Sequence, residues 1–321
     1  MDLQLFSLDP GSALAAGVAR ELGAPLSPHE DRNFEDGEHK LRPLVDPRGA
    51  DAFVIASLHG GPQASPHDKL CLLLMFLATL RDHGAARVTA VVPYLAYARK
   101  DRQTKPFDPL GLRYVAQLFE AMGTAQLIVL EAHNVAAFQS AFRCPTVHID
   151  SCPAFDALAE RWAERGPIAV ASPDPGGVKR ALLWREHLEV RLRRPVGFAM
   201  IDKRRSAGVV SGGHLVAGEV EGQSVLLFDD LIASGETMRR GALALREHGA
   251  QDVIAVAAHG LFIAPAADAL ADPAITEVAV TDSVPPFRLT GDGPLARKLH
   301  GVSVAALFAQ SIRACHAGWA P

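Results

Sequence analysis

Short apolar runs alternate along the chain with longer stretches in which apolar residues recur every three or four positions. The intervening stretches, such as 110–123 and 237–249, have helical spacing and end in glycine, which suits the position after a helix C-terminus. This alternation predicts an α/β fold built from βαβ units, with a mainly parallel sheet covered by helices. The runs that we expect to be strands are residues 3–8, 52–57, 88–94, 125–133, 167–174, 195–202, 224–230 and 252–260.

The two halves of the chain share a pattern. Residues 76–94 and 241–260 both read as a helix, a His-Gly-Ala turn and a strand. Because helix–turn–strand units are common, one shared unit is weak evidence of a repeat. It nevertheless fits two related α/β domains that meet near residues 145–155.

Composition narrows the class of protein. The chain has 321 residues, 49% of them hydrophobic, and a net charge of -4, which argues against a protein that binds the nucleic-acid backbone. Its cysteines, Cys71, Cys144, Cys152 and Cys315, show neither a disulfide framework nor metal-ligand spacing. The longest apolar run, residues 70–80, is about half as long as a membrane span. We therefore expect a cytoplasmic enzyme with neither nucleic acid nor membrane as a partner.

The segment 225–237, VLLFDDLIASGET, lies where a predicted strand gives way to a helix. In parallel α/β sheets, ligands bind at the carboxyl ends of strands, where the next helix presents backbone N–H groups to an anion. Ser234, Gly235 and Thr237 suit a phosphate, whereas the paired acids Asp229 and Asp230 suit sugar hydroxyls or a cation. The combination indicates a ribose 5-phosphate site. Taken alone, the same pattern is equally typical of an acidic strand end followed by a helix cap.

Five stretches of the sequence resemble motifs of one family. Residues 225–237 resemble the phosphoribosyl diphosphate motif, which phosphoribosyltransferases share with ribose-phosphate diphosphokinases, also called phosphoribosyl diphosphate synthetases. The remaining stretches resemble the diphosphokinases alone, and phosphoribosyltransferases lack the N-terminal half. These stretches are 33–43 (F-x-D-G-E turn), 91–103 (P-Y-x-x-Y-A-R-Q-D-R), 171–181 (S-P-D-x-G-G-x-x-R-A) and 200–205 (I-D-K-R-R). The chain thus resembles a divergent member of the diphosphokinase family.

This resemblance implies two phosphoribosyltransferase-like domains, each with a mainly parallel sheet flanked by helices. Residues 1–148, joined by the C-terminal segment 300–321, would form the ATP side, and residues 149–299 the ribose 5-phosphate side with the catalytic loop. The implied reaction transfers the diphosphoryl group of Mg-ATP to the anomeric hydroxyl of ribose 5-phosphate, giving phosphoribosyl diphosphate and AMP. It also implies a homo-oligomer, a dimer or hexamer, because the F-x-D-G-E turn of the family reaches a neighbouring subunit.

The resemblance further implies a set of site residues. Lys203 and Arg205 would lie on a catalytic loop and stabilise phosphoryl charge, as fixed cations do in such reactions. His133 and Asp174 would hold Mg²⁺, which suits few protein ligands because water and phosphate oxygens fill its other positions. ATP would be bound by Phe34, Asp36, Gly37, Glu38, Arg99, Lys100 and Asp101. Ribose 5-phosphate would be bound by Arg205, Asp229, Asp230, Ala233, Ser234, Gly235, Glu236 and Thr237.

Each of these assignments has a structural alternative. Phe34 on its own reads as a core aromatic, residues 98–102 as an exposed turn and residues 203–205 as a solvated basic patch. Strand-end residues such as His133 and Asp174 often only satisfy backbone groups. The order and spacing of the motifs favour the functional assignments.

Several residues depart from the family pattern, and Glu236 is the most disruptive of the two that lie in the phosphate loop. A carboxylate at Glu236 would repel a phosphate unless it turns outward or pairs with a cation such as Arg239 or Arg240. Other departures are Lys100, Glu131, Pro175 and Ala233. Two alternatives therefore stay open: a non-catalytic binding or regulatory relative, and a transferase for a related sugar phosphate. The sequence leaves the preferred nucleotide donor and the allosteric effectors undetermined.

Overall fold

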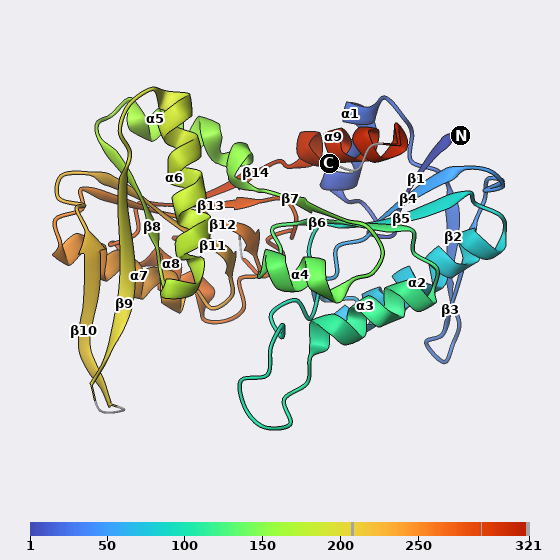
Figure 1. The fold of residues 1–321 in the computed structure, drawn as a ribbon, viewed down its shortest axis with the longest axis horizontal. Coiled ribbons are helices and arrows are strands. Elements are labelled where there is room, and N and C mark those ends of the chain that lie inside the picture. Colours follow the sequence, from blue (N-terminus) through green and yellow to red (C-terminus); the bar gives the residue numbers. More distant parts are fainter. Residues whose placement is uncertain (207–208, 290, 319–321) are drawn as a thin grey trace. The chain divides into compact units, whose positions relative to one another are not determined.

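The computed structural model describes the backbone of residues 1–206, 209–289 and 291–318, and the side chains of all of these except 203–214. The chain forms two compact units, Met1–Asp150 with Ser303–Pro321, and Ser151–Val302 (Figure 1). The boundaries expected from the sequence were 148/149 and 299/300. Within the described part of the chain, none of the helices has both the length and the apolar character needed to cross a bilayer.

The first unit is built on a five-stranded sheet in the order β1-β4-β5-β6-β7, and all of its pairings are parallel. Every residue of β4 and β6 is buried, as expected for strands covered on both faces. Figure 1 shows α1 and α9 on one face of this sheet and α2 and α3 on the other. The strands are Leu3–Ser7, Asp51–Ile55, Arg87–Val92, Gln126–Leu130 and Thr146–Ile149; the helices are α1 Ala13–Leu22, α2 Pro66–Asp82, α3 Gly111–Ala121, α4 Val135–Ala141 and α9 Ala305–His316.

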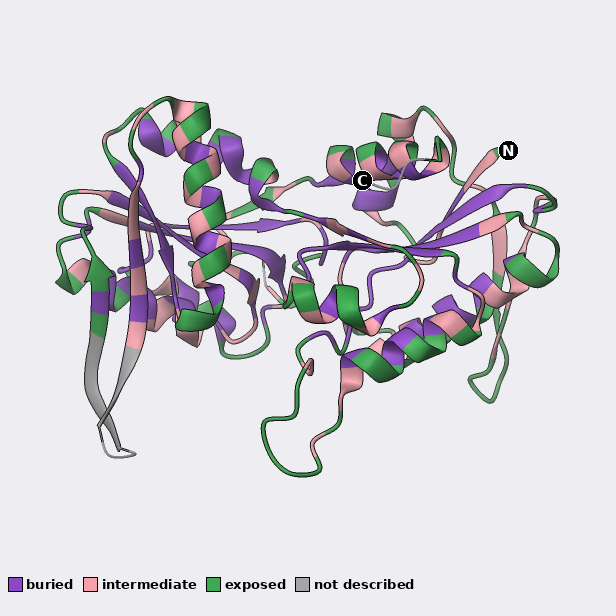
Figure 2. Ribbon diagram, viewed as in Figure 1, coloured by how far each residue is buried: buried purple, intermediate pink, exposed green. Residues whose placement is uncertain are grey.

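A separate antiparallel hairpin, β2 (His29–Asn33) and β3 (His39–Pro43), completes the first unit. None of its residues is buried, and Figure 2 shows it as an exposed arm beside the sheet. The ring of His29 lies 5.5 Å from that of Phe76 in α2, which ties the base of the arm to the unit.

The second unit has a seven-stranded sheet in the order β10-β9-β8-β11-β12-β13-β14. Only β10 is antiparallel to its neighbour. One hydrophobic core lies between the sheet and α7 with α8, and another between the sheet and α5 with α6. The strands are β8 Ile168–Ser172, β9 Gly197–Ser206, β10 Val209–Gly218, β11 Ser224–Ile232, β12 Asp252–Gly260, β13 Glu277–Thr281 and β14 Leu299–Val302; the helices are α5 Asp156–Ala163, α6 Val178–Leu192, α7 Glu236–Glu247 and α8 Ala266–Ala271. The predicted α/β class with two mainly parallel sheets is confirmed.

The His-Gly-Ala turn has the same backbone structure in both units. His83 and His248 follow α2 and α7, and each ring Nδ1 lies 2.8 Å from the carbonyl oxygen four residues earlier. Gly84 and Gly249 come next with φ angles of 89° and 86°, in the left-handed region that glycine adopts without strain. The shared sequence pattern therefore reflects a shared helix–turn–strand unit.

The second sheet reverses its winding between β8 and β11. From β8 the chain passes through α6 to β9 on one side, whereas β11, β12 and β13 extend the sheet on the other side. The pairing of β8 with β11 stops at Ala171↔Leu227, although β11 continues to Ile232. A crevice at such a reversal, beyond the carboxyl ends of the strands, is where open α/β sheets bind ligands.

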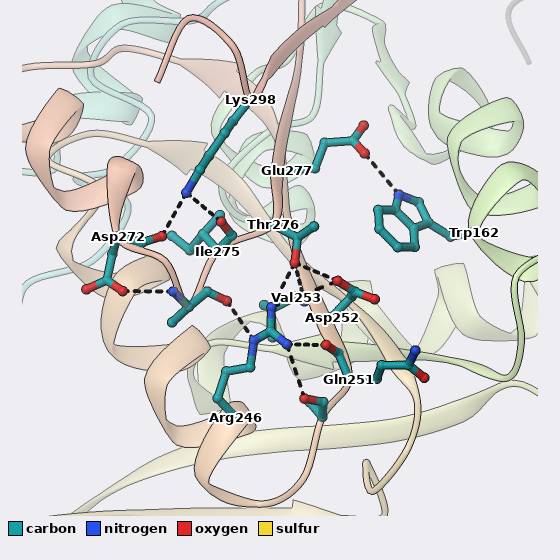
Figure 3. Close-up of polar contacts among 12 residues, drawn as sticks. Trp162, Arg246, Gln251, Asp252, Val253, Asp272, Ile275, Thr276, Glu277 and Lys298 are labelled. Atoms are coloured by element: carbon teal, nitrogen blue, oxygen red, sulfur yellow. Dashed lines mark hydrogen bonds and ion pairs between the residues drawn. The ribbon is translucent and has the colours of Figure 1, made fainter. Parts of the chain in front are cut away.

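The amino ends of β12 and β13 are instead braced by polar contacts (Figure 3). Arg246, in the last turn of α7, donates to the carbonyl of Ala274 at 3.0 Å and to the hydroxyl of Thr276 at 2.8 Å. Lys298 Nζ donates to three backbone carbonyl groups at 2.7–3.0 Å, and burial lowers its pKa. Side chains at the amino ends of these strands therefore stabilise the fold.

Candidate active site

Two carboxylates lie side by side where β11 leaves its pairing with β8. The side chains of Asp229 and Asp230 are only 19% and 6% exposed, and Asp229 Oδ1 accepts the backbone N–H of Asp230 at 2.9 Å. Burial, reinforced by the charge of Asp230, raises the pKa of Asp229 well above its ordinary value. A strongly shifted pKa near the carboxyl end of a strand is typical of a functional group.

Sequence analysis gave no role to Arg180, which the structure brings to this pair. Arg180 comes from the first turn of α6, and its Nη1 lies 3.7 Å from Oδ1 of Asp229 and 3.7 Å from Oδ1 of Asp230. It belongs to the stretch 171–181, whose pattern S-P-D-x-G-G-x-x-R-A contains this arginine. The motif therefore contained a signal for Arg180, although only its aspartate, Asp174, was assigned a role from the sequence.

Asp174 lies two residues after the end of β8, the neighbour of β11, at the same carboxyl end of the sheet. Its Oδ1 accepts the N–H groups of Gly176 at 2.8 Å and Gly177 at 3.1 Å, so its carboxylate is held in a fixed orientation. A side chain at Gly177 would place Cβ 2.7 Å from the hydroxyl of Ser172, which explains why the turn needs glycine there. The structure therefore places Asp174 and the aspartate pair on adjacent strand ends.

Residues 233–235 lead from β11 into α7, which begins at Glu236. Gly235 has a φ of 73°, and a Cβ there would lie 2.9 Å from Leu270 Cγ, so both backbone and space require glycine. Among the residues described, no side chain caps the N-terminus of α7. Its first N–H groups are thus available to a bound anion, as the phosphate-loop expectation requires.

Glu236, the residue that departs most from the expected loop, is held by two arginines. Arg239 donates to its two carboxylate oxygens at 2.9 and 3.0 Å, and Arg240 Nε lies 3.7 Å from Oε1. The hydrogen bonds from Arg239 lower the pKa of Glu236, so the side chain is ionised and paired. Of the two arrangements expected for Glu236, an outward turn or pairing with a cation, the structure shows the pairing with Arg239 and Arg240.

In the first unit, the loop after β5 meets the loop after β6. Asp101 accepts a hydrogen bond from Asn134 Nδ2 at 2.7 Å, and Asn134 follows His133 directly. The structure therefore brings residues 99–101 and His133 to the same carboxyl edge of this sheet. Lys100 has a different contact: its Nζ lies 2.6 Å from Asp108 Oδ2 and braces the loop that follows.

The hairpin turn with Phe34, Asp36, Gly37 and Glu38 is well formed but lies elsewhere. The N–H of Phe34 donates to the carbonyl of Glu38 at 2.8 Å, and Gly37 has a φ of 90°. Figure 1 shows this turn at the opposite end of the first unit from the loop that follows β5. One copy of the unit thus does not bring Phe34, which is 42% exposed, to residues 99–101.

Lys203 and Arg205 have side chains outside the described residues. Their backbone continues β9, paired antiparallel with β10 through Lys203↔His214 and Arg205↔Val210. The segment expected to open a loop therefore stays in a strand as far as Ser206. In the portion of the chain that the structure describes, no cluster of three or more His, Cys, Asp or Glu side chains is arranged for a metal ion.

Comparison with known proteins gives one consistent family. Residues 3–123 match the family model of the N-terminal domain of ribose phosphate pyrophosphokinase, and residues 211–320 match the phosphoribosyl synthetase-associated domain. The chain is 34% identical to a ribose-phosphate pyrophosphokinase of Caldanaerobacter subterraneus over 98% of this chain and 95% of that one. It is 36% identical to a Prochlorococcus marinus protein of the same name, over 88% and 82%. A crystal structure of phosphoribosylpyrophosphate synthetase from Mycobacterium smegmatis superimposes with a TM-score of 0.86 at 31% identity, covering 99% of this chain and 100% of that one.

The crowding of Asp229 predicts that the free protein becomes more stable when this charge is removed. Because burial and Asp230 oppose ionisation in the folded state, Asp229→Asn should raise Tm at pH 7, by about 2 °C if about 1 kcal/mol is relieved. The raised pKa means that the wild type gains stability as pH falls through it, so the difference in Tm should shrink there.

Differential scanning calorimetry against pH measures this effect. Asp174→Asn is the matched control: its amide oxygen can keep both N–H contacts, so we expect no rise in Tm. A lower Tm for Asp229→Asn would show that the charge is not under strain.

Proposed function

We propose that this chain, which belongs to the ribose-phosphate pyrophosphokinase family, transfers the diphosphoryl group of Mg-ATP to the anomeric hydroxyl of ribose 5-phosphate. The products are phosphoribosyl diphosphate and AMP. The observation that carries the proposal is the aspartate pair near the N-terminus of α7, at the point where the second sheet reverses its winding. No side chain among the described residues caps that helix.

Both the 5-phosphate and the hydroxyl groups of ribose 5-phosphate have suitable partners in this arrangement. The N–H groups of residues 233–235 and of the first turn of α7 bind the 5-phosphate. Ionised carboxylates only accept hydrogen bonds, so Asp229 and Asp230 bind ribose hydroxyls. Hydrogen bonds from those hydroxyls stabilise the charged form of Asp229, whose pKa is raised in the free protein. Sugar binding therefore relieves part of the strain in the site.

The first unit supplies the ATP side in this proposal. Arg99 and Asp101, with His133 on the next strand, lie at one carboxyl edge, where a triphosphate finds both a guanidinium and N–H donors. Lys203 and Arg205 on β9 provide positive charge for the transferring group. Little covalent chemistry falls to the protein, since aligning the hydroxyl with the β-phosphorus and neutralising charge account for most of such catalysis.

Magnesium fits the proposed ligands. Mg²⁺ is usually held by one or two protein side chains, with water and substrate phosphates in the other positions. Asp174 meets this requirement, because two backbone N–H groups hold its carboxylate in place at the strand end. His133 is exposed after β6 and is the proposed ligand in the first unit. When bound, the ion neutralises charge on the phosphoryl oxygens.

The direct test is AMP release from Mg-ATP with different sugar phosphates. We expect AMP with ribose 5-phosphate, and none with ribose 1-phosphate or ribose 1,5-bisphosphate, in which the anomeric oxygen is blocked. Chelation should abolish release, and added Mg²⁺ should restore it. No AMP with any sugar would favour a non-catalytic relative, whereas release with a different sugar phosphate alone would favour a related transferase.

Glu236 predicts a change in sugar affinity. The glutamate occupies Arg239 and competes for the N-terminus of α7, so Glu236→Gly should lower KM for ribose 5-phosphate by roughly two- to fivefold. KM for ATP should hardly change, because other stretches bind the nucleotide. Glu236→Gln, which removes the charge at constant size, separates charge from space. A higher KM for the sugar phosphate would identify the glutamate as a ligand contact and favour another substrate.

We also propose a homo-oligomer, a dimer or hexamer, in which the hairpin turn of one subunit completes the ATP site of another. The proposal is supported by the exposure of Phe34 and by its distance, within one unit, from the loop after β5.

Mixing two damaged variants tests this arrangement. Phe34→Ala and Asp101→Ala should each have low activity, and subunit exchange should restore part of it, because some mixed sites contain neither change. The control is each variant taken alone through the same exchange. A mixture no more active than its components, or a fully active monomer by light scattering, would contradict the arrangement.

A further inference from the structure

Arg180 is the one cation that the described contacts place against both members of the aspartate pair. We infer that Arg180 is a positioning residue, which holds the carboxylates of Asp229 and Asp230 together so that both can bind the ribose. The inference rests on the proposed function, because it concerns how the same pair receives its sugar.

Asp229 and Asp230 need a positioning residue because they are adjacent along one strand. Successive side chains of a strand point to opposite faces, and two adjacent carboxylates repel each other. In this structure Oδ1 of Asp229 and Oδ1 of Asp230 nevertheless lie at the same distance, 3.7 Å, from one nitrogen of Arg180. The pairing with β8 has ended at Leu227, so the sheet itself does not fix the side chains on that side. Arg180, the cation that both carboxylates share, holds the two side chains in place of β8.

The position of Arg180 is fixed by its helix. Arg180 is 16% exposed on its side chain, and Trp184, one turn later in α6, is fully buried. The ring of Trp184 lies 4.7 Å from that of Phe228, the residue directly before the pair. One face of α6 therefore contacts three consecutive residues of β11, and its packing against Phe228 sets how far Arg180 reaches.

The contacts also define what Arg180 contributes. The two ion pairs share one nitrogen, Nη1, so one positive charge serves both carboxylates. A lysine in its place could supply the same single charged nitrogen. Glutamine could not, and the two aspartates would then lose their common partner.

The experiment measures binding and turnover in the full-length protein. Arg180→Gln should weaken binding of ribose 5-phosphate, measured by calorimetry without ATP, by roughly 10–100-fold, and raise its KM similarly. KM for ATP should stay within about twofold. Arg180→Lys should recover most of the affinity. In a double-mutant cycle with Asp230→Asn, the two losses should be clearly non-additive, since the residues act as one unit.

Arg246→Gln is the matched control. Arg246 is an arginine of the same unit that braces carbonyl groups at the other edge of the sheet (Figure 3), so its loss should lower Tm and leave the affinity for ribose 5-phosphate unchanged. A similar fall in Tm without weaker binding in Arg180→Gln would make Arg180 merely structural. If Arg180→Gln does not fold, the affinity of Arg180→Lys decides, because a loss as large as that expected for Gln contradicts the charge role.

The outcomes separate the inference from the proposed function. Wild-type turnover together with normal sugar binding in Arg180→Gln overturns the inference alone, and so does a lower kcat at unchanged affinity, which would place Arg180 on the transferring group. Sugar binding without any AMP release overturns the proposed function, and the binding data still decide the role of Arg180. A wild type that does not bind ribose 5-phosphate overturns both.

Discussion

The candidate site of the second unit is governed by the repulsion between two adjacent, largely buried carboxyl groups near the end of β11. Asp229 and Asp230 lose hydration there and repel each other, which raises the pKa of Asp229. Arg180 reduces this cost without removing it, because it faces both carboxylates, and the pairing of β11 with β8 ends at Leu227, two residues before the pair. In the proposed function, the hydroxyls of ribose 5-phosphate relieve the remaining strain, which would make the site selective for a sugar.

The N-terminus of α7, the proposed phosphate end of the site, attracts negative charge, whereas the aspartate pair repels it. The N-terminus of α7 offers N–H groups without a capping side chain among the described residues, and Gly235 lets the backbone turn sharply into the helix. Glu236 places a carboxylate at this positive end, and Arg239 and Arg240 hold it in the free protein. In the proposed function, this paired internal anion competes with the 5-phosphate for the N-terminus of α7.

Apolar patterning predicted most of the buried strands, because a strand covered on both faces is largely apolar along its length. It missed β13, Glu277–Thr281, although all five of its residues are buried. Residues 224–230 and 252–260 agree with β11 and β12 to within two residues. The hairpin β2–β3 was missed because none of its residues is buried and its charges alternate without a hydrophobic face. The short edge strand β14 was missed for the same reason, since its four residues include no buried one.

A sequence pattern can indicate a residue that the backbone dictates, but not a side chain that acts across the fold. Gly235 before α7 could be predicted because the turn into the helix needs a residue with positive φ. Arg180 was overlooked because its partners are about 50 residues away in the sequence, and only the packing of α6 on β11 brings them together.

The central claim is that the β8–β11 crevice binds ribose 5-phosphate. Hydrogen–deuterium exchange of the full chain, with and without ribose 5-phosphate and without ATP, measures it most directly. The predicted result is slower exchange confined to the segments 174–180 and 229–239, with residues 99–108 unchanged. Protection confined to the first unit, or none at a concentration that saturates binding, would contradict the claim.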